Sequence, residues 1–346
     1  MPTPPILIAT RGSALALAQA NMVLAQCRAA FPKLQFELKI IKTTGDKFQA
    51  ASLAQEGGSL PKGLFTKELE VALIKKRADL AVHSLKDLPT ELPAGLKLGA
   101  VGKRADVRDV LIYRDAEYLK AAEADKDSVE WTPGQSSRRG FGPKSALTDL
   151  PQGAVLATSS TRRKAQVLAH NPGLKVPEIR GNVVTRLTKV ADNADLDATI
   201  LALAGITRLN FRISPQGRLE GDAVPDGLLA TVLETDVMLP CVGQGAVGIE
   251  VRADDERIAT ICERLNHFNT FQCVTAERAF LAAMGGGCAS PVAAYAEVDG
   301  TKMRMRALSF ANGPMLRAEA TRSIKEPVEL GQQIASELSP NANPRE

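Results

Sequence analysis

The chain has 346 residues, of which 45% are hydrophobic and 24% are charged. This length exceeds what one ordinary core supports, so we expect a soluble globular protein of two or three domains. The net charge of +4 is too small to predict nucleic-acid binding, and an aromatic content of 4% offers few stacking platforms.

The apolar stretches of the sequence are short. Ile200–Ala204, one of the longest, cannot span a bilayer. Ile6–Ala9 is too brief for the core of a secretory signal, and no charged region precedes it. We therefore expect a cytoplasmic protein without a membrane partner, or a stromal one if a transit peptide has been removed.

Two segments repeat the same order of patterns. Residues 6–24 and 155–168 each show a short apolar strand, an Ala-Thr step, a serine suited to N-capping and a helical stretch. Residues 63–82 and 181–202 each show an amphipathic helix that leads into a buried strand. Because parallel strands need such crossovers, the sequence predicts two α/β domains of like topology that face a shared cleft.

A polar turn follows the apolar strand in residues 79–90. Ser84, Lys86 and Asp87 come directly after this strand, and Pro89 prevents regular structure from continuing. Ligands of α/β sheets bind at the carboxyl ends of the strands, so an acid beside a cation here indicates chemistry. A solvated turn is the alternative interpretation.

Arginines crowd one region in the middle of the sequence. The six are Arg162, Arg163, Arg180, Arg186, Arg208 and Arg212. Such a run can be a solvated face, but arginine also grips planar carboxylates in a bidentate fork. Helix N-termini beside arginine, expected in both repeats, would add further sites for negative groups.

Two other segments change the pattern. Residues 115–150 contain many turn formers and no clear periodicity, so we expect a long surface insertion. Beyond about residue 268 we expect a small α+β domain. Its elements are a helix over 275–284, strands at 292–298, 303–308 and about 317–321, and a closing helix from Pro327.

The sequence Gly243–Gly248 matches the dinucleotide fingerprint G-x-G-x-x-G. The residues that follow alternate like a strand instead of opening a helix, which argues against a dinucleotide site. We expect these glycines to permit a close approach between backbone segments.

The cysteines and histidines show no metal-binding or disulfide pattern. The five cysteines lack C-x-x-C spacing, and the three histidines lack metal spacing, so we expect no metal and at most one reactive thiol. Cys288 lies on a loop of small residues that could leave room for a bulky group on its sulfur. A buried structural cysteine is the commoner case.

In their order along the chain, seven motifs resemble those of the hydroxymethylbilane synthase (porphobilinogen deaminase) family. They are Ala9–Ser13, Lys62–Phe65, His83–Asp87, Thr158–Arg163, Arg180–Asn182, Gly243–Ala246 and Gly286–Cys288. In this family a cysteine carries a dipyrromethane cofactor through a thioether. The enzyme joins four porphobilinogen molecules head to tail, releases ammonia at each step and frees a linear tetrapyrrole by hydrolysis.

The resemblance implies a fold of two type II periplasmic-binding-protein-like α/β domains around a cleft, plus a small C-terminal α+β domain with an antiparallel three-stranded sheet. Domain 1 would comprise residues 1–103 and 246–265. Domain 2 would comprise residues 104–240 with the insertion 115–150, and domain 3 residues 268–346.

The resemblance also implies roles for individual residues. Asp87 would be the catalytic carboxylate and Cys288 the cofactor attachment point. The other cofactor-binding residues would be Lys86, Asp87, Thr158, Ser160, Arg162, Arg163 and Arg186. The substrate-binding residues would be Arg11, Ser13, Lys62, Arg180, Arg186 and Arg208. A fixed carboxylate suits this chemistry, because both the substrate that loses ammonia and the attacked pyrrole become cationic.

We expect a monomer that takes porphobilinogen and has no nucleic-acid or membrane partner. The alternative is a two-domain binding module for polyanionic small molecules. The two repeats and the arginine cluster fit both hypotheses, whereas Asp87 and Cys288 favour the enzyme.

Overall fold

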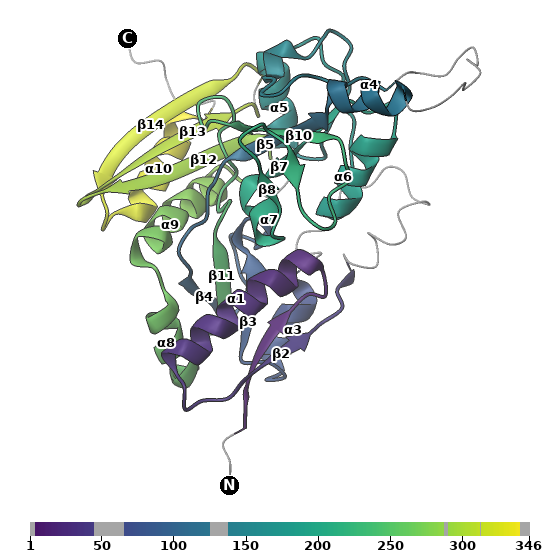
Figure 1. Ribbon diagram of the computed structural model, residues 1–346. Helices are drawn as coiled ribbons and strands as arrows, with labels where there is room; N and C mark the ends of the chain where they lie inside the picture. The colour runs from purple at the N-terminus through teal and green to yellow at the C-terminus, as the bar shows by residue number, and fades with distance from the viewer. Residues whose placement is uncertain (1–3, 45–65, 125–137, 287–289, 312, 340–346) are drawn as a thin grey trace, which may run out of the picture. The chain divides into compact units, whose positions relative to one another are not determined.

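The computed structural model describes residues 4–44, 66–124, 138–286, 290–311 and 313–339 (Figure 1). The chain divides into two compact units. One joins Met1–Asp106 to Pro240–Glu346, and the other is the continuous segment Val107–Leu239. The finer division into three domains stays a prediction.

A five-stranded mixed sheet forms part of the first unit. Its order is β2 (Phe36–Ile40), β1 (Ile6–Thr10), β3 (Leu80–Ser84), β11 (Val247–Arg252) and β4 (Leu96–Val101). β1 is parallel to both β2 and β3, whereas β11 is antiparallel to β3 and β4. The strands expected near Ile6 and Leu80 are therefore confirmed.

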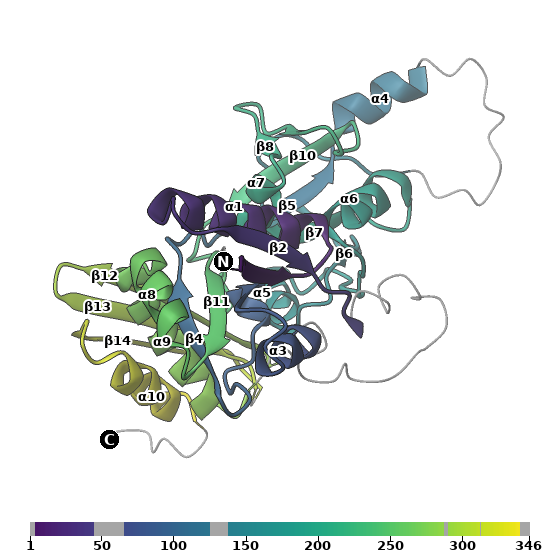
Figure 2. The same ribbon diagram turned by 90° about the horizontal axis from the view of Figure 1, so that it is seen from below.

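Helices cover both faces of this sheet, as Figure 2 shows. Ile8 and Leu80 pack with α1 (Ala14–Ala30) and α8 (Glu256–Leu265) on one face. Ala9 and Ala81, one residue further along each strand, pack with α3 (Lys67–Ile74) on the other. Successive side chains of a strand point to opposite faces, so continuous apolar runs are needed here.

The second unit contains a four-stranded sheet in the order β10 (Leu228–Leu233), β5 (Asp109–Arg114), β7 (Ala198–Ala202) and β6 (Leu156–Ala157). A parallel bridge from Val155 to Lys175 extends it beyond β6. Read from that bridge, the order matches the first sheet strand for strand, and β5, like β11, is the antiparallel member. This match confirms the two α/β domains of like topology. The other elements of the unit are α4 (Ala116–Ala124), η2 (Leu147–Asp149), α5 (Thr161–His170), α6 (Val183–Asp192), α7 (Leu203–Arg208), β8 (Arg212–Ile213) and β9 (Leu219–Glu220).

An aspartate–arginine pair recurs at equivalent places in the two sheets. Asp79 accepts a hydrogen bond from the β1 backbone at 2.8 Å and pairs with Arg252 at the end of β11. Asp197 accepts one from the backbone just before β6, also at 2.8 Å, and pairs with Arg114 at the end of β5. The repeat therefore extends from topology to individual side chains.

The C-terminal part of the first unit is the expected antiparallel sheet with two helices. It consists of α9 (Phe268–Ala283), β12 (Val292–Asp299), β13 (Lys302–Ser309), β14 (Leu316–Ser323) and α10 (Pro327–Glu337), visible together in Figure 1. α9 starts seven residues earlier than predicted. The His267 side chain caps it by accepting a hydrogen bond from the Thr270 amide.

Two further expectations can be compared with the described residues. A strand, β11, begins at Val247 within the glycine-rich segment, which confirms that a strand and not a Rossmann helix follows these glycines. The insertion 115–150 was predicted without periodicity, yet its first part forms α4; residues 125–137 lie outside the described ranges. None of the helices in the described ranges has the length and apolarity needed to cross a membrane.

Candidate active site

Asp87 lies in a single turn at the carboxyl end of β3. The 3₁₀ turn η1 (Leu85–Asp87) follows Ser84 directly, and the Leu88 amide closes it by donating to the Leu85 carbonyl at 3.1 Å. The Asp87 side chain is exposed, and within the described parts of the chain no group donates a hydrogen bond to its carboxylate. A carboxylate without a protein partner at a strand end is available to a ligand.

The end of β1 lies beside this turn, because β1 and β3 are parallel neighbours. Arg11 and Ser13 follow β1, and both are half-buried. The Ser13 hydroxyl caps α1 by accepting from the Ala16 amide at 3.3 Å. The first unit thus places four predicted site residues at one sheet edge: Arg11, Ser13, Lys86 and Asp87. Lys62 lies outside the described residues.

Gly243 of the glycine-rich segment packs against the backbone of the turn that carries Asp87. Gly243 adopts φ +71°, and a Cβ on it would lie 3.2 Å from the Lys86 amide nitrogen and 3.3 Å from the Leu85 carbonyl carbon. A larger residue would therefore be strained in backbone and in packing. His83 and Glu250, both buried, join β3 to β11 through an Nε2–Oε2 contact of 2.9 Å. The contact gives His83 a structural role between these two strands.

In the second unit, Thr158 and Ser160 follow β6 as Arg11 and Ser13 follow β1. Ser160 caps α5 by accepting from the Arg163 amide at 3.4 Å, while Thr158 is buried. The serine N-cap predicted in both repeats is confirmed. Hydroxyls and helix N-terminal amides therefore share this strand end.

Arg162 and Arg163 share one buried carboxylate, that of Asp109 at the start of β5. Arg162 Nη2 lies 2.8 Å from Asp109 Oδ2, and Arg163 Nη2 lies 2.7 Å from Oδ1. Burial disfavours the charged carboxylate, but the two guanidinium groups outweigh it and hold the pKa of Asp109 well below its usual range. Asp109 is not predictable from the sequence, since no local pattern links it to residues more than fifty positions away.

The remaining predicted arginines lie on or beside helices of the second unit. Arg180 is exposed and pairs with exposed Glu178 at 3.1 Å. Arg186 on α6 is half-buried, and its Nε donates to the Gly181 carbonyl at 2.8 Å. Arg208 ends α7, and burial lowers its pKa. An exposed ion pair contributes little to stability, so Arg180 can exchange Glu178 for a ligand carboxylate at low cost.

Cys288 lies outside the described residues. Burial raises the pKa of Cys27 to about 11 and the pKa values of Cys262 and Cys273 to about 12. These three thiols stay protonated at neutral pH and act as small core residues. Within the described ranges, no three His, Cys, Asp or Glu side chains are placed to hold a metal ion.

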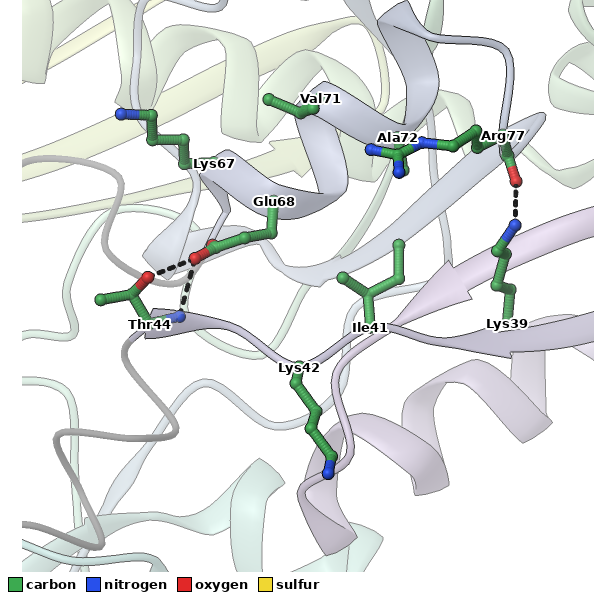
Figure 3. A pocket seen from close by; sticks show the side chains of 9 residues that line it. All are labelled: Lys39, Ile41, Lys42, Thr44, Lys67, Glu68, Val71, Ala72 and Arg77. Carbon is green, nitrogen blue, oxygen red and sulfur yellow. Dashed lines mark hydrogen bonds between the residues drawn. The ribbon is translucent and has the colours of Figure 1, made fainter.

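A cavity of about 440 Å³ lies between the end of β2 and α3 (Figure 3). Its nine lining residues are Lys39, Ile41, Lys42, Thr44, Lys67, Glu68, Val71, Ala72 and Arg77. Figure 3 shows the Glu68 carboxylate accepting from Thr44 and Lys39 donating to the Arg77 carbonyl. None of the nine is a predicted site residue, so the candidate site depends on the strand ends and not on this cavity.

Two family models match the chain. Residues 6–260 match "Porphobilinogen deaminase, dipyromethane cofactor binding domain", and residues 271–339 match "Porphobilinogen deaminase, C-terminal domain".

Curated relatives match over nearly the full length. The chain is 38% identical to the porphobilinogen deaminase of Carboxydothermus hydrogenoformans over 335 residues, covering 96% of this chain and 93% of the relative. It is 40% identical to that of Chlorobium phaeobacteroides and 39% identical to that of Thermus thermophilus, covering 94% and 95% of those relatives and 96% of this chain.

Among solved structures, the BenM effector binding domain with benzoate matches with a TM-score of 0.39 and 16% identity, covering 75% of this chain and 90% of that one.

Proposed function

Because this chain belongs to the porphobilinogen deaminase family, we propose that it joins four porphobilinogen molecules head to tail, with Asp87 as the catalytic carboxylate. Ammonia leaves at each step, and hydrolysis frees the linear tetrapyrrole hydroxymethylbilane. The observation that carries the assignment of Asp87 is its exposed carboxylate at the end of β3, to which no described residue donates a hydrogen bond.

The described residues fit a dipyrromethane cofactor. Such a group presents pyrrole N–H donors and carboxylates, so it needs one acceptor and several cations or hydroxyls. Asp87 is such an acceptor, and the predicted set that would hold the carboxylates is Lys86, Thr158, Ser160, Arg162, Arg163 and Arg186. When bound, the group supplies the pyrrole carbon at which chain growth begins. We propose its covalent attachment to Cys288.

Asp87 would act on the charges that develop in the substrate. Loss of ammonia from the aminomethyl group leaves a cationic methylene, and the carboxylate stabilises it while accepting a hydrogen bond from the pyrrole N–H. The same carboxylate can take the proton released when the new carbon–carbon bond forms. The acetate and propionate groups of substrate and product would be held by Arg11, Ser13, Lys62, Arg180, Arg186 and Arg208.

We further propose that the protein works in the cytoplasm as a monomer, without nucleic-acid or membrane partners. Its modest charge of +4 and low aromatic content support the absence of a nucleic-acid partner.

The proposal is tested by intact mass spectrometry and turnover of the purified chain. We expect a covalent dipyrrole on the wild type that is absent from Cys288→Ser. Asp87→Asn should fold normally and lose roughly 10²–10⁴-fold in turnover, whereas Glu91→Gln, an exposed acid four residues later, should not change it. A wild type with neither added mass nor turnover would favour the binding-module hypothesis.

A further inference from the structure

The backbone after Asp87 is bound by one side chain from α9. Arg278 donates from Nη1 to the Leu88 carbonyl at 3.0 Å, and from Nη2 to the carbonyls of Pro89 at 2.6 Å and Thr90 at 3.2 Å. Three successive carbonyls thus converge on one cation. Such charge-assisted hydrogen bonds are about twice as strong as neutral ones.

These bonds replace contacts that regular structure would provide. Residues 88–90 belong to neither a helix nor a strand, and Pro89 has no amide hydrogen to donate. The Arg278 side chain is half-buried, and desolvation lowers its pKa. Placing a cation here has a desolvation cost, which its bonds to the carbonyls offset.

The preceding residue of α9 holds the other flank of the turn. Glu277 is fully buried, and its Oε2 accepts from the Gly243 amide at 2.8 Å. Gly243 in turn packs against the backbone of Leu85 and Lys86. Arg104 forms a two-pronged ion pair with Glu277 at 2.6 and 3.0 Å, which holds this carboxylate in place.

The Asp87 carboxylate receives no hydrogen bond from any described residue, so its position depends on the backbone of η1. Two neighbouring residues of α9 support this turn. Arg278 binds the carbonyls of the three residues that follow it, and Glu277 binds the amide of Gly243, which lies against the backbone of the turn. We propose that Arg278 is a positioning residue that fixes the Asp87 carboxylate for the reaction, with Glu277 as its partner on the opposite flank. The proposal rests on the catalytic role proposed for Asp87.

Positioning predicts a kinetic pattern that a purely structural role does not. A misplacement of about 1 Å costs up to roughly 100-fold in rate, so Arg278→Gln should lower kcat by roughly 10- to 100-fold and leave KM within about twofold. Arg278→Lys, which keeps a cation but loses the fork, should retain an intermediate kcat.

The matched control is Arg252, which also donates to backbone carbonyls of the first unit. Its partners are the carbonyls of Leu73 and Ala78, near the opposite end of β3 from Asp87. Arg252→Gln should lower the melting temperature and leave kcat unchanged when assayed well below that temperature.

The decisive measurement is a double-mutant cycle in kcat on the intact full-length protein. The amount of bound dipyrrole in each variant is measured by intact mass spectrometry. If Arg278 acts through Asp87, Arg278→Gln should reduce kcat at least about tenfold in the wild type and less than about twofold in Asp87→Glu. Equal losses in both backgrounds would overturn the proposal. So would a loss of bound dipyrrole from Arg278→Gln, or an equal loss of kcat from Arg252→Gln.

A second variant and the behaviour of the wild type complete the test. If Arg278→Gln does not fold, Arg278→Lys is cycled in its place, and an unchanged kcat in that variant overturns the proposal. A wild type that neither carries a dipyrrole nor turns over porphobilinogen rejects the proposed function itself, which is a different result from an active wild type with a neutral Arg278→Gln.

Discussion

At the scale of single residues, Arg162 and Arg163 are predicted to bind the cofactor, and both also form ion pairs within the protein. Both side chains are almost fully buried and both bind Asp109. A cofactor carboxylate would thus meet guanidinium groups whose positions Asp109 has already set. Preorganised cations of this kind lose less conformational entropy on binding than mobile surface arginines do.

The Asp109 cluster predicts a pH-dependent contribution to stability. Its folded pKa lies below the unfolded value of about 3.9, so the carboxylate stabilises the fold at neutral pH, and this contribution is lost as the pH falls below about 4. Asp109→Asn should cost about 3–5 kcal/mol at pH 7, because it leaves two buried cations without their carboxylate. Urea unfolding should show the gap to wild type narrowing as the pH falls below about 4.

The control for this prediction is Asp195→Asn, an exposed aspartate of the same unit. It should change the free energy of unfolding by less than about 0.5 kcal/mol. A gap between wild type and Asp109→Asn that stays constant from pH 7 to pH 3 would contradict the assigned ionisation.

At the scale of elements, α9 connects the C-terminal sheet to the Asp87 turn and packs closely against α10. Gly331 on α10 makes this contact possible, since a Cβ there would lie 2.2 Å from the Ala276 carbonyl oxygen and 2.7 Å from the Phe280 amide nitrogen. Both atoms belong to the α9 backbone, which cannot rotate away. The two helices can therefore approach closely only where α10 has no side chain.

Gly331→Ala should consequently destabilise the protein by about 1–3 kcal/mol, although alanine is intrinsically the better helix former by about 1 kcal/mol. Urea unfolding monitored by circular dichroism measures the change. Gly102→Ala is the control, because a Cβ there has no heavy atom within 4 Å. A stabilised Gly331→Ala would mean that α10 shifts without penalty.

At the scale of the whole molecule, the fold combines two α/β sheets of like strand order with a C-terminal three-stranded antiparallel sheet and its two helices. Sequence-distant strands complete the first sheet: β11 lies between β3 and β4, although more than 140 residues separate it from β4 in the chain. The second unit is instead one continuous segment with its own apolar clusters around β5, β7 and β6.

Because Val107–Leu239 is one continuous segment with its own apolar clusters, we predict that it folds on its own. The isolated fragment should unfold cooperatively in urea, as a domain with a complete core does. A fragment of residues 116–239 lacks β5, which lies between β10 and β7, and should not fold. Broad, non-cooperative transitions in both fragments would show that the segment depends on the first unit.

The sequence determined the local elements and the family. Apolar periodicity located the strands and helices of both repeats, and the motif order identified the porphobilinogen deaminase family, because both are properties of neighbouring residues. Its errors were local as well. α9 begins at Phe268 with a histidine cap, which is an uncommon N-cap, and α4 forms inside a segment that was predicted to be aperiodic.

The pairing of charged side chains with their distant partners, by contrast, emerged from the packing of the elements. Arg278 and Leu88 are 190 positions apart, and Asp109 lies 53 and 54 positions before its two arginines. Pairs separated by such distances form because the elements that carry them pack together. The local sequence pattern around either residue does not show which distant residue will be its partner. The sequence therefore pointed to Asp87, whereas packing revealed that α9 holds the turn that carries it.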